Sequence, residues 1–249
     1  MTIETNSKSN GVNSVNSDQH SQSSVLPTSL QVERHGDIAV LRINRAKKRN
    51  ALNDATVLGL EAFFTNPPQG VRAVVLDADG DHFSAGLDLS ELTERDAFGA
   101  LEHSRMWHRV FDRIEHGTLP VISVLKGAVV GGGGSVRIPR LIGAHRMTDM
   151  MLTGRVLSAE EGHTLGLSHY LTGPGEGLTK ALELAGKVAG NSPVTNFAVL
   201  QALPRITQAS PDEGYLLESL MAAVAGSSTE AQTRMRAFLD GRAGKVQRT

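Results

Sequence analysis

The chain has 249 residues, of which 40% are apolar and 20% charged, and its formal net charge is -1. This balance gives no reason to expect nucleic acid or an anionic membrane as a partner through bulk charge. Cysteine is absent, which excludes disulfides and thiolate chemistry, and the histidines lack metal-ligand spacing, so we expect no metal site. No apolar run approaches the ~18 residues of a membrane span.

Residues 1–27 differ in composition from the rest of the chain. Serine and asparagine dominate this stretch, and it holds too few apolar residues to offset the entropy lost on ordering. The sequence therefore predicts a disordered tail. The tail has no continuous apolar segment of the secretory type and no arginine, so we expect a cytoplasmic protein.

The next region alternates between strand and helix patterns. Asp37 to Ile43 predicts a strand, and Asp54 to Phe64 predicts a helix capped by Asn53 or Asp54. Two apolar, β-branched runs have the pattern of buried strands, Val71 to Asp77 and Pro120 to Leu125, with a long helix between them over Asp96 to His116. This order predicts an α/β core over residues 28–190.

After Ser135 the pattern is almost wholly helical. Ser158-Ala-Glu-Glu161 fits a capping box, and apolar side chains repeat at helical spacing from Pro211 to Val224. A second apolar stripe consists of Ala231, Met235, Phe238 and Leu239. Such stripes are more often core or subunit interface than part of a cofactor site. We therefore expect residues 191–249 to form a helical region that serves in oligomerisation.

A basic segment follows the first predicted strand. Arg45, Lys47, Lys48 and Arg49 place four cations within five residues. Such a cluster suits a phosphorylated ligand. Taken alone, however, a solvated charge run is the more common explanation.

Two glycine-bearing turns follow the two predicted buried strands. The first is His82-Phe-Ser-Ala-Gly-Leu-Asp-Leu89, in which Ala85 and Gly86 allow a tight turn at the carboxyl end of a strand. An ordinary strand-to-helix turn capped by Asp88 or Ser90 is the alternative. The second is Lys126-Gly-Ala-Val-Val-Gly-Gly-Gly-Gly134. Two such turns can direct backbone N–H groups at one oxygen and so stabilise an oxyanion.

Together these motifs resemble those of the crotonase superfamily, the enoyl-CoA hydratases and isomerases. The match rests on ordered segments within residues 30–240: Asn44 to Leu52, Phe83 to Asp88, Lys126 to Gly132, Gly133 to Gly143 and Met150 to Gly162. The resemblance implies an α/β fold, a ββα superhelix with a C-terminal helical extension. It also implies an acyl-CoA thioester as substrate, no cofactor beyond the CoA of that substrate, and assembly as homotrimers or hexamers.

The resemblance also implies roles for individual residues. The backbone N–H groups of Leu87 and Gly132 correspond to the family's oxyanion hole, where about 3–4 kcal/mol of stabilisation comes from one donor. Arg45, Lys47 and Lys48 would lie near the CoA phosphates and adenine. Ala85, Gly86 and Asp88 belong to the turn that binds the substrate.

The chain departs from the family at the second glycine turn. Family members have roughly thirty residues here, room for a helix and a strand, between two glycine-rich segments, whereas Val130-Gly-Gly-Gly-Gly134 runs straight into Ser135. We therefore expect an internal deletion at Gly131–Gly134, an incomplete core and a less stable protein. The family's acid and base carboxylates have no counterparts, and spacing singles out none of the nearest ionisable residues, Asp88, Glu115, His116 and Asp149.

These observations leave open whether the chain is an enzyme. The motifs favour an enoyl-CoA hydratase or isomerase that acts through a backbone oxyanion hole. The missing carboxylates favour a catalytically impaired protein that binds acyl-CoA or serves in assembly. A nucleotide-binding glycine loop is a third alternative, but the run lacks the Gly-Lys-Ser/Thr ending of a P-loop.

Overall fold

A computed structural model describes residues 26–130 and 133–242. Its centre is a four-stranded sheet with the strands in chain order: β1 (Leu30–His35), β2 (Ile38–Ile43), β3 (Ala73–Ala78) and β4 (Val121–Ser123). β1 pairs antiparallel with β2, whereas the β2–β3 and β3–β4 pairs are parallel. The predicted Asp37–Ile43 strand is confirmed as β2. The sequence did not indicate β1, because only Leu30 of that strand is buried.

Two helices connect the parallel strands, as predicted. α1 (Asp54–Thr65) joins β2 to β3, and α2 (Ala97–Glu115) joins β3 to β4. Asn53 caps α1 by accepting from the Thr56 N–H, and Asp96 caps α2 by accepting from the Gly99 N–H. These caps satisfy N–H groups that a helix start leaves unpaired. The helix starts predicted from the sequence agree with both caps.

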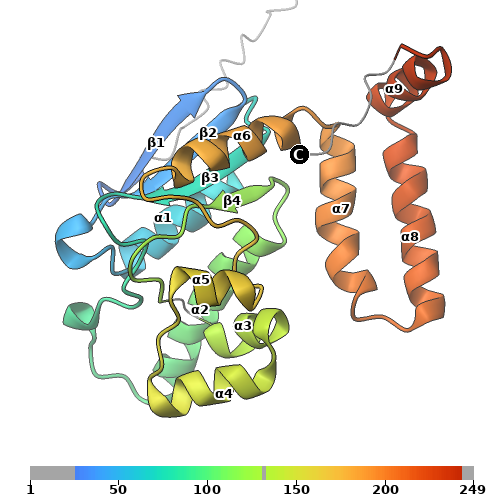
Figure 1. Cartoon of the computed structure of the whole chain (residues 1–249). Helices are drawn as coiled ribbons and strands as arrows, with labels where there is room; N and C mark the ends of the chain where they lie inside the picture. Colours follow the sequence, from blue (N-terminus) through green and yellow to red (C-terminus); the bar gives the residue numbers. More distant parts are fainter. Residues whose placement is uncertain (1–25, 131–132, 243–249) are drawn as a thin grey trace, which may run out of the picture.

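The sheet has an apolar core on each face. Every residue of β3 is buried, and because side chains alternate across a strand, neighbours face opposite sides. Val74 and Leu76 pack with α1 and α2, whereas Ala73 and Val75 pack with α6 (Gly177–Ala189). Figure 1 shows α6 across one face of the sheet and α1 on the other.

The strand predicted over Pro120 to Leu125 is confirmed as β4, but the prediction that it is buried is wrong. β4 has only three residues, and these range from half-buried to exposed. The reason is its place in the sheet, since β4 lies at the edge, with only β3 beside it in the part of the chain that the structure describes. Its β-branched residues gave the pattern of an interior strand.

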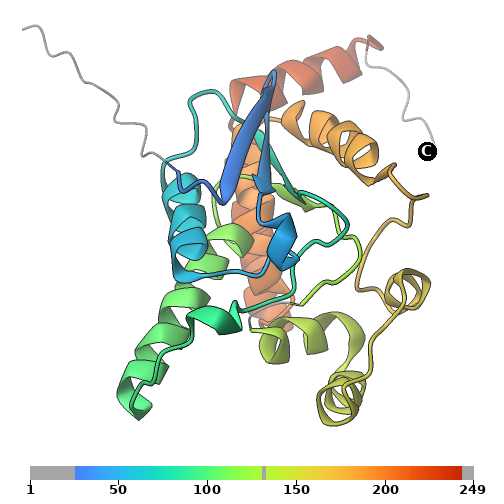
Figure 2. The same cartoon turned by 90° about the vertical axis from the view of Figure 1, so that its left-hand side faces the viewer.

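The region after Ser135 is helical, as predicted. Besides α6 it contains α3 (Gly134–Ile142), α4 (Ala144–Thr153), α5 (Ala159–Thr164), α7 (Pro193–Ile206), α8 (Pro211–Gly226) and α9 (Thr229–Leu239). The capping box at Ser158 and Glu161 is present at the start of α5. Figure 1 shows α7 and α8 as an antiparallel pair standing beside the sheet, and in Figure 2 the two helices overlap behind it.

The predicted apolar stripes lie on α8 and α9, and both are exposed. Leu216 and Leu220 of α8 are 61% and 54% exposed, and Phe238 of α9 is 70% exposed. The stripes therefore do not belong to the core of this chain. Their use as a subunit interface stays a prediction.

The parallel strands place the predicted motifs together. The basic segment follows β2, the first glycine turn follows β3, and the second glycine turn follows β4. Parallel neighbours have their carboxyl ends at the same edge of a sheet, which is where α/β folds bind ligands. All the motifs taken from the sequence therefore lie at one edge.

Candidate active site

A buried asparagine joins the basic segment to the first glycine turn. Asn50 is fully buried with φ of +55°, and its side-chain amide donates to the carbonyls of Asp79 (2.7 Å) and His82 (2.6 Å). Its Oδ1 accepts from the Arg45 N–H, and its own carbonyl accepts from the Ser84 hydroxyl. The sequence motif contained Asn50, but sequence reasoning missed this structural role.

The cations of the basic segment divide into two groups. The Arg45 guanidinium lies 2.7 Å from an oxygen of Asp88, and its side chain is only 15% exposed. Lys48 lies 3.1 Å from the same oxygen but is half exposed, and Lys47 and Arg49 are exposed. Arg45 therefore holds two loops together, whereas Lys47, Lys48 and Arg49 face solvent.

Asp88 is a structural anchor of the first turn. Its carboxylate caps the 3-10 helix η2 (Leu89–Glu91) by accepting from the Ser90 N–H, which confirms the capping alternative. Hydrogen bonds from the Ser90 hydroxyl and from Arg45 hold the pKa of Asp88 well below its usual range, against the effect of burial. A carboxylate with so low a pKa is a weak base, so Asp88 does not suit proton transfer.

The backbone N–H groups of the first turn differ in whether they have a hydrogen-bond acceptor. The N–H of Ala85 donates to the Arg49 carbonyl, that of Gly86 to the Ser84 hydroxyl, and that of Asp88 to the Leu52 carbonyl. Within residues 26–130 and 133–242, no acceptor bonds the Leu87 N–H. Between Ala85 and Asp88, the Leu87 N–H is therefore the donor that no described acceptor bonds, and it lies at the position that the family resemblance indicates.

The two glycine turns lie side by side up to Val130. Ser84 and Val129 form a parallel bridge, in which the Ser84 N–H donates to Ala128 and the Val130 N–H donates to Ser84. Gly86 has φ of +84°, and a Cβ at this position would lie 2.9 Å from a methyl carbon of Val130. Gly86 is thus required by both conformation and contact. Gly132, the predicted second donor, lies outside the described residues.

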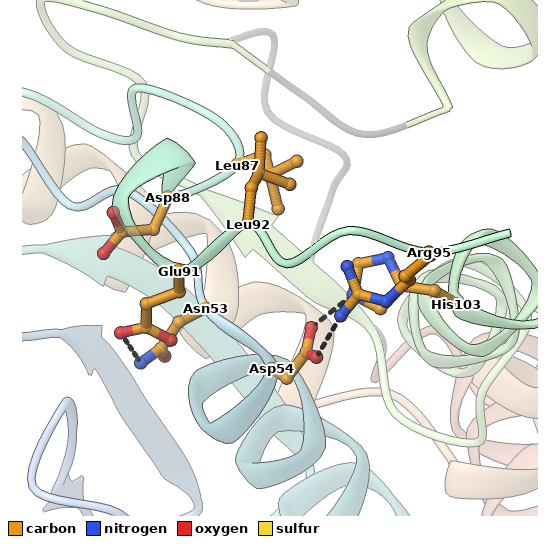
Figure 3. Close-up of a pocket in the computed structure, with 8 residues that line it drawn as sticks. All are labelled: Asn53, Asp54, Leu87, Asp88, Glu91, Leu92, Arg95 and His103. Atoms are coloured by element: carbon orange, nitrogen blue, oxygen red, sulfur yellow. Dashed lines mark hydrogen bonds and ion pairs between the residues drawn. The ribbon is translucent and has the colours of Figure 1, made fainter. Parts of the chain in front are cut away.

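A small cleft opens beside the Leu87 turn. Figure 3 shows Leu87 and Leu92 on one side and the start of α1 on the other. Its lining comes from α1, η2, the segment between η2 and α2, and α2 itself: Asn53, Asp54, Leu87, Asp88, Glu91, Leu92, Arg95 and His103. The cleft therefore brings Leu87 together with ionisable side chains.

A cluster around Asp54 lines this cleft. The Asp54 Oδ1 atom accepts from the Trp107 indole (3.0 Å) and lies 2.6 Å from the His103 Nε2 atom, while Arg95 lies 3.7 Å from Oδ2. Burial alone raises the pKa of Asp54, but the hydrogen bonds of Trp107 and His103 and the nearby cations lower it overall. Sequence reasoning missed this pair, because 49 residues separate its members.

Other kinds of site were also sought in the described residues. They contain no group of three or more His, Asp or Glu side chains that could hold a metal ion. No helix among them is long and apolar enough to cross a membrane.

Comparison with known proteins identifies the family. The sequence model of the enoyl-CoA hydratase/isomerase family matches residues 33–138. A Thermus thermophilus protein named among the enoyl-CoA hydratases is 30% identical, over 86% of this chain and 98% of the relative. The short-chain-enoyl-CoA hydratase of Clostridium acetobutylicum is 27% identical, over 85% and 94%.

Solved structures agree with these sequence matches. A crystal structure from Rhodopseudomonas palustris, also named among the enoyl-CoA hydratases, is 52% identical and superposes with a TM-score of 0.83, covering 86% of this chain and 95% of the other. The chain belongs to the enoyl-CoA hydratase/isomerase family and has the crotonase fold.

The same comparisons show a difference in length. The alignment with the Thermus protein runs over 249 positions but takes in 86% of this 249-residue chain, about 214 residues, so about 35 positions of the relative have no counterpart. The family-model match ends at residue 138, just after the glycine run. A gap of this size agrees with the expected loss of one helix and one strand.

Proposed function

We propose that this protein acts on acyl-CoA thioesters as an enoyl-CoA hydratase or isomerase, with the Leu87 N–H as a donor to the thioester oxygen. The observation that carries the proposal is the Leu87 N–H itself, which no described acceptor bonds, in a turn whose neighbouring N–H groups all have acceptors. A donor held in place before the reaction stabilises negative charge as it develops and needs no reorganisation. Gly132 is the second donor in this proposal.

The chemistry follows from where the charge develops. When water adds to the β-carbon of an enoyl thioester, electrons move to the thioester oxygen and form an enolate. Isomerisation passes through an enolate as well, after loss of a proton from the acyl chain. A donor about 2.7–3.1 Å from that oxygen lowers the barrier of either reaction.

The CoA end and the acyl end of the ligand both fit at the carboxyl ends of the parallel strands. Lys47 and Lys48 are exposed beside the turn and suit the phosphates of CoA. In this proposal Arg45 contributes indirectly, since its ion pair with Asp88 fixes the basic segment against the turn. The acyl chain enters the cleft past Leu87 and Leu92.

Assembly is a separate proposal. The exposed apolar side chains of α8 and α9, among them Leu216, Leu220 and Phe238, suit a contact between copies of the chain. We propose a homotrimer or hexamer formed through this helical region. Light scattering measures the mass directly, and a monomer at micromolar concentration would contradict the proposal.

Crotonyl-CoA tests the function. Hydration removes the conjugated thioester and its ultraviolet absorbance, and we expect this loss to depend on protein concentration. Titration calorimetry with butyryl-CoA measures binding without turnover. Absence of binding would overturn the proposed ligand, whereas binding without turnover would support the impaired protein instead.

The donor role of Leu87 has its own readout. A hydrogen bond to the thioester oxygen weakens the C=O bond, so the carbonyl stretch of bound, ¹³C-labelled crotonyl-CoA should fall below its value in water. Raman difference spectroscopy measures this shift. An unshifted stretch for a ligand that calorimetry shows to be bound would remove Leu87 from the proposal.

A further inference from the structure

The cleft beside Leu87 holds few groups able to accept a proton. Asp88 is bonded to Arg45, Lys48 and Ser90. Glu91 accepts from the Asn53 side chain at 2.9 Å and lies 3.5 Å from Arg45. Both carboxylates therefore already have cationic or hydrogen-bonding partners. His103 is different, because its partner is itself an acceptor.

The imidazole of His103 is oriented by Asp54. The two residues come from different helices, α2 and the first turn of α1, and meet at 2.6 Å between Nε2 and Oδ1. An ionised carboxylate only accepts, so Nε2 carries the hydrogen and Nδ1 of the neutral ring keeps its lone pair. No described residue bonds Nδ1, and the side chain is 19% exposed at the wall of the cleft. Figure 3 shows His103 next to Arg95, with both side chains directed at the Asp54 carboxylate.

We propose that His103 is the general acid–base of this cleft, that it acts on the bound acyl chain or on water beside it, and that Asp54 is its positioning residue. This inference rests on the proposed function, and it supplies the proton-transfer group for which the sequence offers no family carboxylate. A base held by a carboxylate on its other nitrogen is a recurring catalytic arrangement.

One imidazole can carry out both proton transfers of hydration and both of isomerisation. In hydration, His103 Nδ1 takes a proton from water while the water oxygen bonds to the β-carbon and the thioester oxygen becomes the enolate oxygen at Leu87. The imidazolium then returns that proton to the α-carbon, and the C=O bond forms again. In isomerisation, the same nitrogen removes a proton from the acyl chain and returns it at a different carbon.

Exchange of the α-protons of butyryl-CoA with deuterium isolates the proton-transfer step. Proton NMR in deuterium oxide measures the rate with no need for water addition. We expect His103→Gln to lower exchange and crotonyl-CoA hydration on the order of 100-fold or more, the usual size of general acid–base catalysis. We expect His103→Ala to regain part of the exchange when imidazole is added, which loss of a structural contact would not allow.

His116→Gln is the matched control. His116 lies at the C-terminal end of α2, the helix that carries His103. Its Nδ1 atom lies 2.7 Å from Asp112, so it forms a similar pair away from the cleft. We expect this variant to exchange at the wild-type rate. Asp54→Asn should retain ligand binding and lose part of the rate, as a positioning role requires.

The outcomes separate this inference from the proposed function. If the wild type does not bind butyryl-CoA in calorimetry, the proposed function fails and this inference fails with it. If the wild type binds but neither exchanges nor hydrates, the proposed enzymatic activity and this inference are both overturned. If the wild type is active and His103→Gln matches it, the inference alone is overturned. If binding is equal in both proteins and exchange is lost only in the variant, the inference is supported.

Discussion

Single residues join the loops of the site. Asn50 bonds the carbonyl of Asp79, just before the first glycine turn, and that of His82 at its start, and Asp88 bonds two cations of the basic segment. Neither residue has to touch a ligand to be essential, because each fixes backbone of the proposed site. The position of the Leu87 N–H depends on both.

Replacement of Asn50 tests the first of these anchors. Asn50→Ala removes the hydrogen bonds of its side chain to the carbonyls of Asp79 and His82 and from the N–H of Arg45, and each such bond contributes about 0.5–1.5 kcal/mol. We therefore expect the free energy of unfolding in urea to fall by about 2 kcal/mol. Asn66→Ala, at an exposed helix end, is the control and should change it little. Similar values for the two variants would contradict the role of Asn50.

Asp88 makes stability depend on pH. Its pKa is lowered in the folded protein, whereas the unfolded chain has a value near ~3.9, so the stabilisation is present above about pH 4 and is lost as the pH falls below it. Asp88→Asn should destabilise the protein at pH 7, and the difference from the wild type should shrink toward pH 3. Urea unfolding across this range measures it, with Glu94→Gln, at an exposed position, as the control. A difference independent of pH would be inconsistent with this account.

At the scale of elements, the close approach of α6 to the sheet depends on alanine. Ala181, Ala185 and Ala189 face the β2, β3 and β4 strands and are buried. Small side chains at this spacing allow helix and sheet to pack without a gap. The sheet face under α6 therefore leaves no room for larger residues.

A pair of substitutions on α6 tests this packing. Ala185→Leu should destabilise the protein by about 1–3 kcal/mol, the usual cost of overpacking a filled core. Gly186→Leu makes a comparable addition at the next position, where a Cβ would have nothing within 4 Å. Thermal unfolding should show a lower melting temperature only for Ala185→Leu. Equal losses would show that the helix itself, not its contact with the sheet, was perturbed.

Elements with local signals were predictable, and those set by distant partners were not. The cap at Asn53 indicated the start of α1, and the apolar run of β3 indicated a buried strand. β1 was missed because five of its six residues are exposed. The predicted burial of β4 was wrong because a sequence does not show which strand lies at the edge of a sheet. In the site, the turn at Leu87 was predictable from its sequence motif. The meeting of Asp54 with His103 depends on how α1 packs against α2, which no local pattern encodes.

At the scale of the whole molecule, the chain is shorter than its relatives. About 35 aligned positions of the Thermus protein have no counterpart, and the sheet of the described residues ends at β4. We propose that the shortening lies at Gly131–Gly134. Apolar surface that the relatives bury against a further strand and helix is then lost, at about 25 cal/mol for each Å².

Restoring the stretch tests this proposal. We expect insertion of the corresponding segment of the Rhodopseudomonas palustris protein between Gly132 and Gly133 to raise the melting temperature. A Gly/Ser segment of equal length at the same position is the control and should not raise it. Equal melting temperatures for all three proteins would contradict the proposed position of the deletion.

The length of β4 has a consequence for the behaviour of the protein at high concentration. An edge strand presents backbone N–H and C=O groups that another chain can pair with, and long, flat edges are sites of aggregation. β4 has only three residues. It therefore offers a second chain a template too short for stable pairing, so self-association through the sheet is disfavoured at this edge.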